Sequence, residues 1–440
     1  MLKELRRLYK KRTNDASGFD AIGPFVDVMR ETKFYPPFET ITDGVNEPIC
    51  TIDGRQYLLF CANNYMSLSG HPEVKAAAIR AIDKYGIGPG GARVIAGNVD
   101  IIEELEARIA ELTGTEDCLT LPTGYMANVS IFQALLEPFI LGRPSAKGDG
   151  AVFLDEYNHG SIWDGLLHTS ALIFQYQHDD LESLERKLAS CDRPNKLIVT
   201  EGVYSLEGEI ADIPAYIDIA RRHGAWLMVD DAHGIGVVGE HGGGVGEHFG
   251  CADGIDVLMG CMDKAMGGTG GYLCGKKPLI DYLRLAMRSS LLSSAIPCGM
   301  AGGVIAAINH LQNDTQRRKS LFDKAQYLRD ALRSKGLTVL GEDNIPSLAV
   351  LVGDEDIGIA FAEALYDRGI FCALVRWPAA PQGKARFRVI VMADHTYEQL
   401  DYFADNCEAV ARQLGVLGVL EPVCAGDPSS DHGQSRTRLT

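Results

Sequence analysis

The stretch Ala225-Trp226-Leu227-Met228-Val229-Asp230-Asp231-Ala232-His233 decides the fold of this chain. A short apolar run ends here in two acids and a histidine, which is typical of a buried parallel strand that delivers polar groups at its carboxyl end. A second run of this kind, Ile255-Asp256-Val257-Leu258-Met259-Gly260, follows further along the chain. Because open α/β sheets bind ligands at the carboxyl ends of their strands, the two runs predict one ligand site where both end.

The sequence on either side of this stretch alternates between strand and helix patterns. Apolar runs of strand length occur at 151–155, 172–176 and 196–200, and apolar residues recur at helical spacing in 72–85 and 101–112. Alternation of this kind predicts an α/β fold, with a large, mostly parallel sheet and helices on both of its faces.

The remaining sequence divides into an arm, a smaller domain and a tail. A helical segment at 298–336, strands near 348–351 and 386–392, and a helix at 397–414 predict a smaller α+β domain. The expected division is an N-terminal arm at 1–70, a large domain at 71–300, a small C-terminal domain at 301–418, and a polar, disordered tail at 419–440.

Composition narrows the class of protein. The chain has 440 residues, 46% of them hydrophobic and 23% charged, as in ordinary globular proteins. Its net charge of -17 argues against nucleic-acid binding, which relies on basic surface. The apolar runs are too short for a membrane span, and the charged start lacks a signal-peptide apolar region, so a cytoplasmic location is expected. The eleven cysteines contain no CxxC pair, which predicts reduced thiols rather than a disulfide or metal framework.

Lys264 follows the second apolar run, in the glycine-rich stretch from Met262 to Tyr272. A lone lysine before glycines is usually a solvated loop residue, but this one follows a strand whose end is expected beside Asp230. A lysine there can form a Schiff base with the aldehyde of pyridoxal 5'-phosphate (PLP). Asp230 can keep the pyridine nitrogen protonated, and His233 can reach the phenolic oxygen. Lys264 and the strand end that carries Asp230 therefore predict PLP as cofactor.

Three further segments follow predicted strands at the same edge of the sheet. Thr123, Gly124 and Tyr125 open a helix, where backbone N–H groups could bind a phosphate. His159 could stack on a flat pyridine ring, and Ser205 could donate a hydrogen bond near it. Each also has an ordinary interpretation, because many helices open with Thr-Gly and a lone histidine is more often structural.

Six segments, in this order along the chain, resemble one known family. They are Phe60-Cys61-Ala62-Asn63-Asn64-Tyr65, Gly90-Gly91-Ala92-Arg93, Asn158-His159-Gly160-Ser161-Ile162-Trp163-Asp164-Gly165, Glu201-Gly202-Val203-Tyr204-Ser205, Val229-Asp230-Asp231-Ala232-His233 and Lys264-Ala265. Together they are similar to the α-oxoamine synthases, within the fold-type I PLP-dependent transferases. The resemblance covers residues 60–414 and implies a sheet of the seven-stranded type.

The resemblance implies a role for each matching residue. Lys264 resembles the Schiff-base lysine, which also transfers protons, and Asp230 the partner of the pyridine nitrogen. His233 resembles the donor to the phenolic oxygen, and His159 the ring that stacks on the cofactor. The other matches are Gly124 and Tyr125 at the phosphate, Asn64 and Ser205 at the substrate and ring, and Arg388 at the amino-acid carboxylate.

Two more inferences come from the same resemblance. Arg376, in Arg376-Trp377-Pro378-Ala379-Ala380-Pro381, resembles the substrate-binding loop of the serine palmitoyltransferase branch. Family members are homodimers with shared active sites, so Ser293 and Ser294 are expected near the phosphate of the neighbouring subunit.

The reaction implied is a decarboxylative condensation of a small amino acid with an acyl thioester, carried by coenzyme A or a carrier protein, to give an α-aminoketone. Cys261 and Asp263 stand where the family usually has hydroxyl residues or glycine, and Ala92 and Ala295 stand where it has serine, which indicates a divergent member. Two alternatives stay open. One is another PLP reaction on the same scaffold, with an S-adenosylmethionine-type amine or by transamination; the other is a non-catalytic partner subunit.

Overall fold

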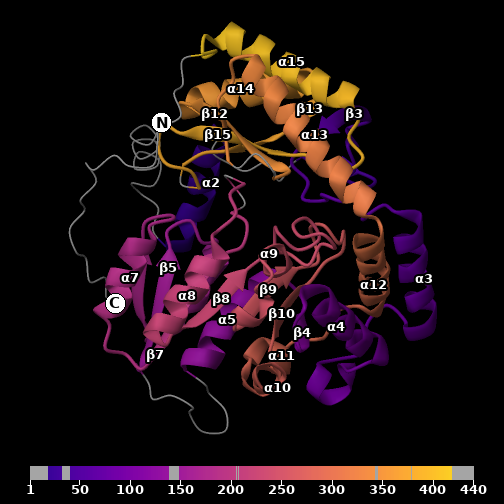
Figure 1. The fold of residues 1–440 in the computed structure, drawn as a ribbon. Helices are drawn as coiled ribbons and strands as arrows, with labels where there is room; N and C mark the ends of the chain where they lie inside the picture. Colours follow the sequence, from indigo (N-terminus) through magenta and orange to yellow (C-terminus); the bar gives the residue numbers. More distant parts are fainter. Residues whose placement is uncertain are drawn as a thin grey trace.

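The computed structural model describes residues 18–31, 40–137, 148–204, 206, 208–341, 345–377 and 379–418. A large domain carries a central sheet, and a smaller domain lies against one edge of it (Figure 1). None of the described helices is long and apolar enough to cross a membrane.

The sheet of the large domain has seven strands, six of them running in one direction. Their order is β4 (Asp117–Leu121), β10 (Gly271–Gly275), β9 (Val257–Cys261), β8 (Trp226–Asp230), β7 (Asn195–Glu201), β5 (Gly150–Asp155) and β6 (Leu172–Tyr176). Only β10 is antiparallel to its neighbours. Every residue of β5, β9 and β10 is buried, as expected for strands covered on both faces. The predicted fold class is confirmed.

Helices cover both faces of this sheet. Alternate side chains of β5 belong to different cores, since Val152 and Leu154 join one cluster while Ala151 and Phe153 join the other. The helices are α3 (Pro72–Tyr85), α4 (Asp100–Thr113), α5 (Gly124–Leu136), α6 (Gly160–Leu166), α7 (Leu181–Ala189), α8 (Ile213–His223), α9 (Val245–His248), α10 (Lys277–Ala286), α11 (Arg288–Leu292) and α12 (Cys298–Asn313). Three short helical turns are η1 (Gly18–Ala21), η2 (Arg93–Gly97) and η3 (Ala252–Gly254).

The small domain has an antiparallel sheet of β11 (Val339–Leu340), β12 (Ser347–Gly353), β15 (Ala385–Ile390) and β14 (Ala373–Val375). Helices α13 (Thr315–Ser334), α14 (Glu355–Asp367) and α15 (Tyr397–Leu414) pack with it (Figure 1). Helix α15 has the boundaries expected from its apolar spacing, because a capping box of Thr396 and Gln399 begins it and Gly415, at φ 71°, ends it.

The structure differs from the sequence-based expectation at two places. The helical segment 298–336 is two helices, because Asp314 ends α12 and its carboxylate accepts a hydrogen bond from Arg317 N to begin α13. Part of the expected arm also builds sheet structure with the small domain, through β1 (Thr42–Asp43), β2 (Ile49–Ile52) and β3 (Arg55–Leu59), the last paired in parallel with β13 (Ile370–Phe371).

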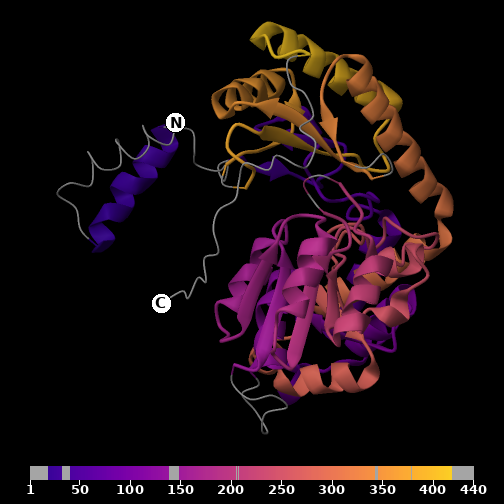
Figure 2. The ribbon, with the colours of Figure 1, turned by 60° about the vertical axis from the view of Figure 1, so that its left-hand side comes forward.

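Helix α2 (Ile22–Glu31) stands apart from both domains (Figure 2). The tail predicted at 419–440 lies outside the described residues.

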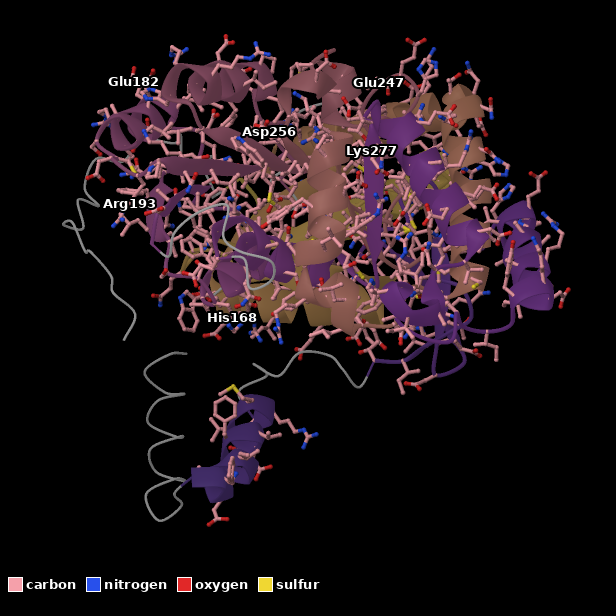
Figure 3. The ribbon with its side chains drawn as sticks, turned by 90° about the horizontal axis from the view of Figure 1, so that it is seen from below. His168, Glu182, Arg193, Glu247, Asp256 and Lys277 are labelled. Atoms are coloured by element: carbon pink, nitrogen blue, oxygen red, sulfur yellow. The ribbon has the colours of Figure 1, made fainter. Side chains whose placement is uncertain are left out.

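The carboxyl ends of the parallel strands face the small domain. Figure 3 looks at the large domain from the opposite side, where the labelled Asp256 and Lys277 lie. Asp256 immediately precedes β9, and Lys277 begins the helix that follows the antiparallel β10, so this side carries the amino ends of the parallel strands. Lys264, at the other end of β9, is therefore on the side of the small domain.

Gly271 of β10 lies directly against the backbone of α5. A Cβ there would lie 2.5 Å from Gly124 Cα and N, which are backbone atoms. We expect Gly271→Ala to lower the free energy of unfolding by about 1–3 kcal/mol, measured by denaturant titration. Gly88→Ala is the control, because its Cβ would meet no atom within 4 Å. Equal stability of the two variants would contradict this packing.

Candidate active site

A cavity of about 1360 Å³ lies where the two domains meet. The large domain contributes the ends of β8 and β9, the start of α5 and the segment from Glu156 to Ser161. The small domain contributes Ala373 and Val375 of β14, Arg388 of β15, Trp377, and residues 379–382. The cavity therefore lies at the carboxyl edge of the sheet, where the sequence places the ligand site.

Lys264 projects into this cavity from a tight turn between β9 and β10. The turn is fixed by hydrogen bonds from Met262 N to Gly270 O (2.9 Å) and from Gly267 N to Lys264 O (3.0 Å). The Lys264 side chain is only 11% exposed, and its Nζ lies 3.7 Å from Asp263 Oδ1. Burial lowers the pKa of Lys264, and the neighbouring Cys261, Asp263 and Asp230 raise it by more. The side chain is thus enclosed and held among acids.

Asp230 ends β8 with its carboxylate in the same cavity. Its Oδ2 accepts a hydrogen bond from Asn128 Nδ2 (2.8 Å), and its Oδ1 accepts one from Ala232 N (3.2 Å). Asn128 belongs to α5, so the helix that opens at Thr123 also orients the carboxylate. These contacts stabilise a buried carboxylate that can pair with a cationic ring nitrogen.

His233 lines the cavity beside Lys264. Its Nδ1 is 2.9 Å from the hydroxyl of Tyr65, which is buried. Desolvation lowers the pKa of His233 well below its usual value, and the charges of Lys264, Arg388 and His159 lower it further. The imidazole is therefore neutral near pH 7, with one ring nitrogen engaged by Tyr65 and the other available.

His159 begins α6 as its N-cap residue. Its Nδ1 is 2.7 Å from Ser161 Oγ, and its backbone N donates to Glu201 Oε1 (2.8 Å). Burial raises the pKa of Glu201 well above its usual value, and the neighbouring Asp230 raises it further. Ser161 and Glu201 therefore fix the place of an imidazole that lines the cavity.

The first turn of α5 also lines the cavity. Thr123 caps this helix, because its Oγ1 accepts a hydrogen bond from Met126 N (3.1 Å). The N–H groups of Gly124 and Tyr125 come before the first intrahelical bond, so they remain available to an anion, as does the positive end of the helix dipole. Tyr125 directs its hydroxyl to Asp164 instead (2.7 Å).

The structure brings some of the expected substrate-binding residues into the cavity and leaves others outside it. Arg388 lines it from the small domain. Asn64 does not, because its amide bonds Ser69 Oγ and the backbone N of Leu68 and Ser69. Asn63 lines the cavity instead, and its buried Oδ1 has no hydrogen-bond partner among the described residues. At this position of the chain, Asn63 and not the expected Asn64 therefore lines the cavity.

Three further expectations concern residues that are not among those found to line the cavity. Arg376 is half-buried and does not line the cavity, although the next residue, Trp377, does. Burial lowers the pKa of Arg376, and the nearby Asp356 and Glu355 of α14 offset only part of this effect. Ser293 lines a smaller surface hollow with Tyr125 and Arg288, and Ser294 is exposed. Ser205 lies outside the described residues.

The chemical groups that line the cavity fit PLP. It offers an enclosed amine at Lys264, an oriented carboxylate at Asp230, a neutral imidazole at His233 and a helix N-terminus for a phosphate. Asn63 and Asn128 also each present a buried Oδ1 that has no partner among the described residues. Such atoms are costly unless a ligand or water satisfies them.

The sequence matches the family described as aminotransferase class I and II over residues 55–406. An 8-amino-7-oxononanoate synthase from Thermosipho melanesiensis is 37% identical over 393 residues, 89% of this chain and 97% of that protein. One from Thermoanaerobacter pseudethanolicus is 38% identical over 380 residues, 86% of this chain and 93% of that protein.

Solved structures agree with these relatives. The serine palmitoyltransferase of Sphingomonas wittichii superposes with a TM-score of 0.84 at 30% identity, covering 91% of this chain and 98% of that one. A second such structure, with PLP as the internal aldimine, has a TM-score of 0.83 at 28% identity, covering 94% of this chain and 99% of that one.

The fold and cavity define a PLP-dependent transferase of fold type I. The chain belongs to the aminotransferase class I and II family and, within it, to the α-oxoamine synthases. The predictions of family, cofactor and enzyme class are thus confirmed: the protein is a PLP-dependent C-acyltransferase that joins an amino acid to an acyl thioester with decarboxylation.

Asp231, next to Asp230, is enclosed outside the cavity. A Cβ on Gly202, Gly234 or Gly244 would come within 2.3 Å of its carboxyl oxygens, and its Oδ2 accepts a hydrogen bond from Val245 N (2.8 Å). Burial raises its pKa from 3.8 to about 8. The folded protein therefore keeps this carboxyl protonated at pH values where the unfolded chain has released the proton.

The raised pKa predicts a pH-dependent stability cost. Relative to Asp231→Asn, the wild type should lose stability as the pH rises from 3.8 to about 8, with no further loss above that range. Thermal unfolding of both proteins at several pH values measures the difference. A difference in melting temperature that stays constant across this range would show that the Asp231 carboxyl is not protonated on folding.

Proposed function

We propose that Lys264 binds PLP covalently and, once a small amino acid has replaced it, moves the proton of the substrate α-carbon. The observation that carries this proposal is the convergence of Lys264, Asp230, His233 and Arg388 on one cavity. Bound PLP supplies an electron-withdrawing ring to this site. The other steps depend on the side chains that surround it.

Each side chain has a distinct task in this proposal. Asp230 stabilises a proton on the ring nitrogen, and His159 supports the flat face of the ring. Tyr65 donates to Nδ1 of the neutral His233, which leaves Nε2–H to donate to the phenolic oxygen. Arg388 binds the amino-acid carboxylate, since its planar guanidinium can make two parallel hydrogen bonds to a carboxylate.

The acyl thioester has a separate part of the same cavity. Val375, Trp377, Ala379, Ala380 and Pro381 give the small-domain side an apolar lining. An acyl chain placed against them would lie opposite Lys264 and Asp230, which belong to the large domain. We infer that the amino acid is held between Arg388 and Lys264, and that the acyl chain lies along this apolar side.

A second copy of the chain completes the proposed enzyme as a homodimer. Large apolar side chains are exposed on neighbouring segments, with Ile87 84%, Ile95 82% and Leu292 71% accessible. The segments are joined by a hydrogen bond from Ala295 N to Gly91 O. Exposed apolar surface of this kind favours association. We place Ser293 and Ser294, which follow Leu292, at the edge of this interface, near the partner's cofactor phosphate.

We also propose a cytoplasmic location. All ten cysteines among the described residues are free, and eight of those are buried. Unpaired thiols are the usual state in a reducing compartment.

Replacement of Lys264 tests the assignment most directly. After incubation with PLP and borohydride reduction, peptide mass spectrometry of the wild type should locate a phosphopyridoxyl group on Lys264. Lys264→Ala should show no adduct and should lose at least about 10³-fold in turnover. An adduct on another lysine, or full turnover by the variant, would falsify the role of Lys264.

Arg388 can be tested by amino-acid saturation. Arg388→Ala should raise the half-saturating amino-acid concentration by about 10- to 100-fold, because a charge-assisted hydrogen bond contributes about 1.5–3 kcal/mol. Arg388→Lys should cost less, since it keeps the charge but not the paired geometry. Saturation by the acyl thioester serves as the control and should change little. Unchanged amino-acid saturation in both variants would remove Arg388 from the carboxylate site.

A further inference from the structure

Asp263 lies beside Lys264 and has no task in the mechanism above. The turn that carries both residues is fixed by hydrogen bonds from Met262 N to Gly270 O (2.9 Å) and from Gly268 N to Met262 O (2.8 Å). Met262 and Ala265, on either side of the pair, are buried. Asp263 and Lys264 both line the cavity. The backbone therefore presents an acid and an amine side by side.

The two side chains form an asymmetric ion pair. Lys264 Nζ lies 3.7 Å from Asp263 Oδ1, and the lysine side chain is 11% exposed while that of Asp263 is 48% exposed. A buried ammonium loses most of its hydration, whereas a half-exposed carboxylate keeps much of its own. Asp263 can thus stabilise the ammonium without a full desolvation cost of its own.

The other titratable groups around Lys264 are mostly uncharged near neutral pH. Burial raises the pKa of Cys261 to about 12 and raises the pKa of Glu201 and Tyr65, while desolvation lowers the pKa of His233. The remaining titratable groups that face the cavity include Glu156, His159, Asp230 and, on the small domain, Arg388. The carboxylate of Asp230 already accepts hydrogen bonds from Asn128 and Ala232. Asp263 is therefore the acid placed to pair with Lys264.

We propose that Asp263 is a positioning residue that holds Lys264 as an ammonium and so sets the pH at which this lysine captures the cofactor. The proposal rests on the assignment of Lys264 as the PLP lysine. To react, the ammonium must release one proton to solvent. The free amine then attacks the aldehyde carbon, a carbon–nitrogen double bond forms, and the aldehyde oxygen leaves as water together with the two remaining amine hydrogens. Asp263 opposes the first of these steps.

The test measures the rate of capture against pH. Full-length apoprotein is mixed with pyridoxal, which has no phosphate, and separately with PLP, and the absorbance change is followed from about pH 6 to 10. Asp263→Asn keeps the shape of the side chain and removes its charge. We expect its rate profile to move about one unit to lower pH, with capture about tenfold faster near neutral pH for both aldehydes.

Glu156→Gln is the matched control, because it removes one acid from the same cavity without an ion pair to Lys264. Its profile should have the wild-type midpoint. If the profile of Asp263→Asn also keeps the wild-type midpoint, the proposal is wrong. If this variant captures PLP faster but pyridoxal at the wild-type rate, the proposal is also wrong, because Asp263 then only repels the phosphate. Failure of the wild type to form an adduct on Lys264 would instead overturn the proposed function, which borohydride trapping and mass spectrometry distinguish.

Discussion

The buried carboxylate of Asp230 is the constraint around which the active site is built. A charge at the end of a buried strand is costly unless hydrogen bonds or an opposite charge compensate it. Here Asn128 and Ala232 N supply the hydrogen bonds, and the nearby Glu201 has a raised pKa, so the two acids need not be ionised together. In the function proposed above, a protonated pyridine ring would supply the opposite charge.

This requirement links several elements of the large domain. Asn128 is fixed by α5, and the same helix begins at Thr123 with the N–H groups that suit a phosphate. Gly271 of β10 packs directly on Gly124. In the proposed function one helix therefore locates both ends of a single ligand, so small shifts of α5 against the sheet would change two contacts together. The turn that carries Lys264 joins β9 to β10 and leads directly into Gly271, so its position depends on the same packing against α5.

Sequence alone was sufficient for the features that are local along the chain. Strand ends such as 229–233 and the turn at Lys264 could be read because strand polarity places their polar residues at one edge. Tyr65 and Asn128 were not found as site residues, since each belongs to a separate segment and acts through a side-chain contact, Tyr65 with His233 and Asn128 with Asp230. The choice between Asn63 and Asn64 depends on the path of one loop. Asn64 turns inward to bond Leu68 N and Ser69 N, which no periodic pattern reveals.

The parallel pairing of β3 with β13 has a consequence for synthesis of the chain. Leu58 is paired with Ile370, and Phe60 N donates to Phe371 O. The early strand β3 therefore cannot form this pairing until β13 has left the ribosome. Until then β3 has an unpaired edge, a feature that invites aggregation. The large domain, whose last helix α12 ends at Asn313, can collapse first. The long-range pairing then makes completion of the small domain the slower stage of folding.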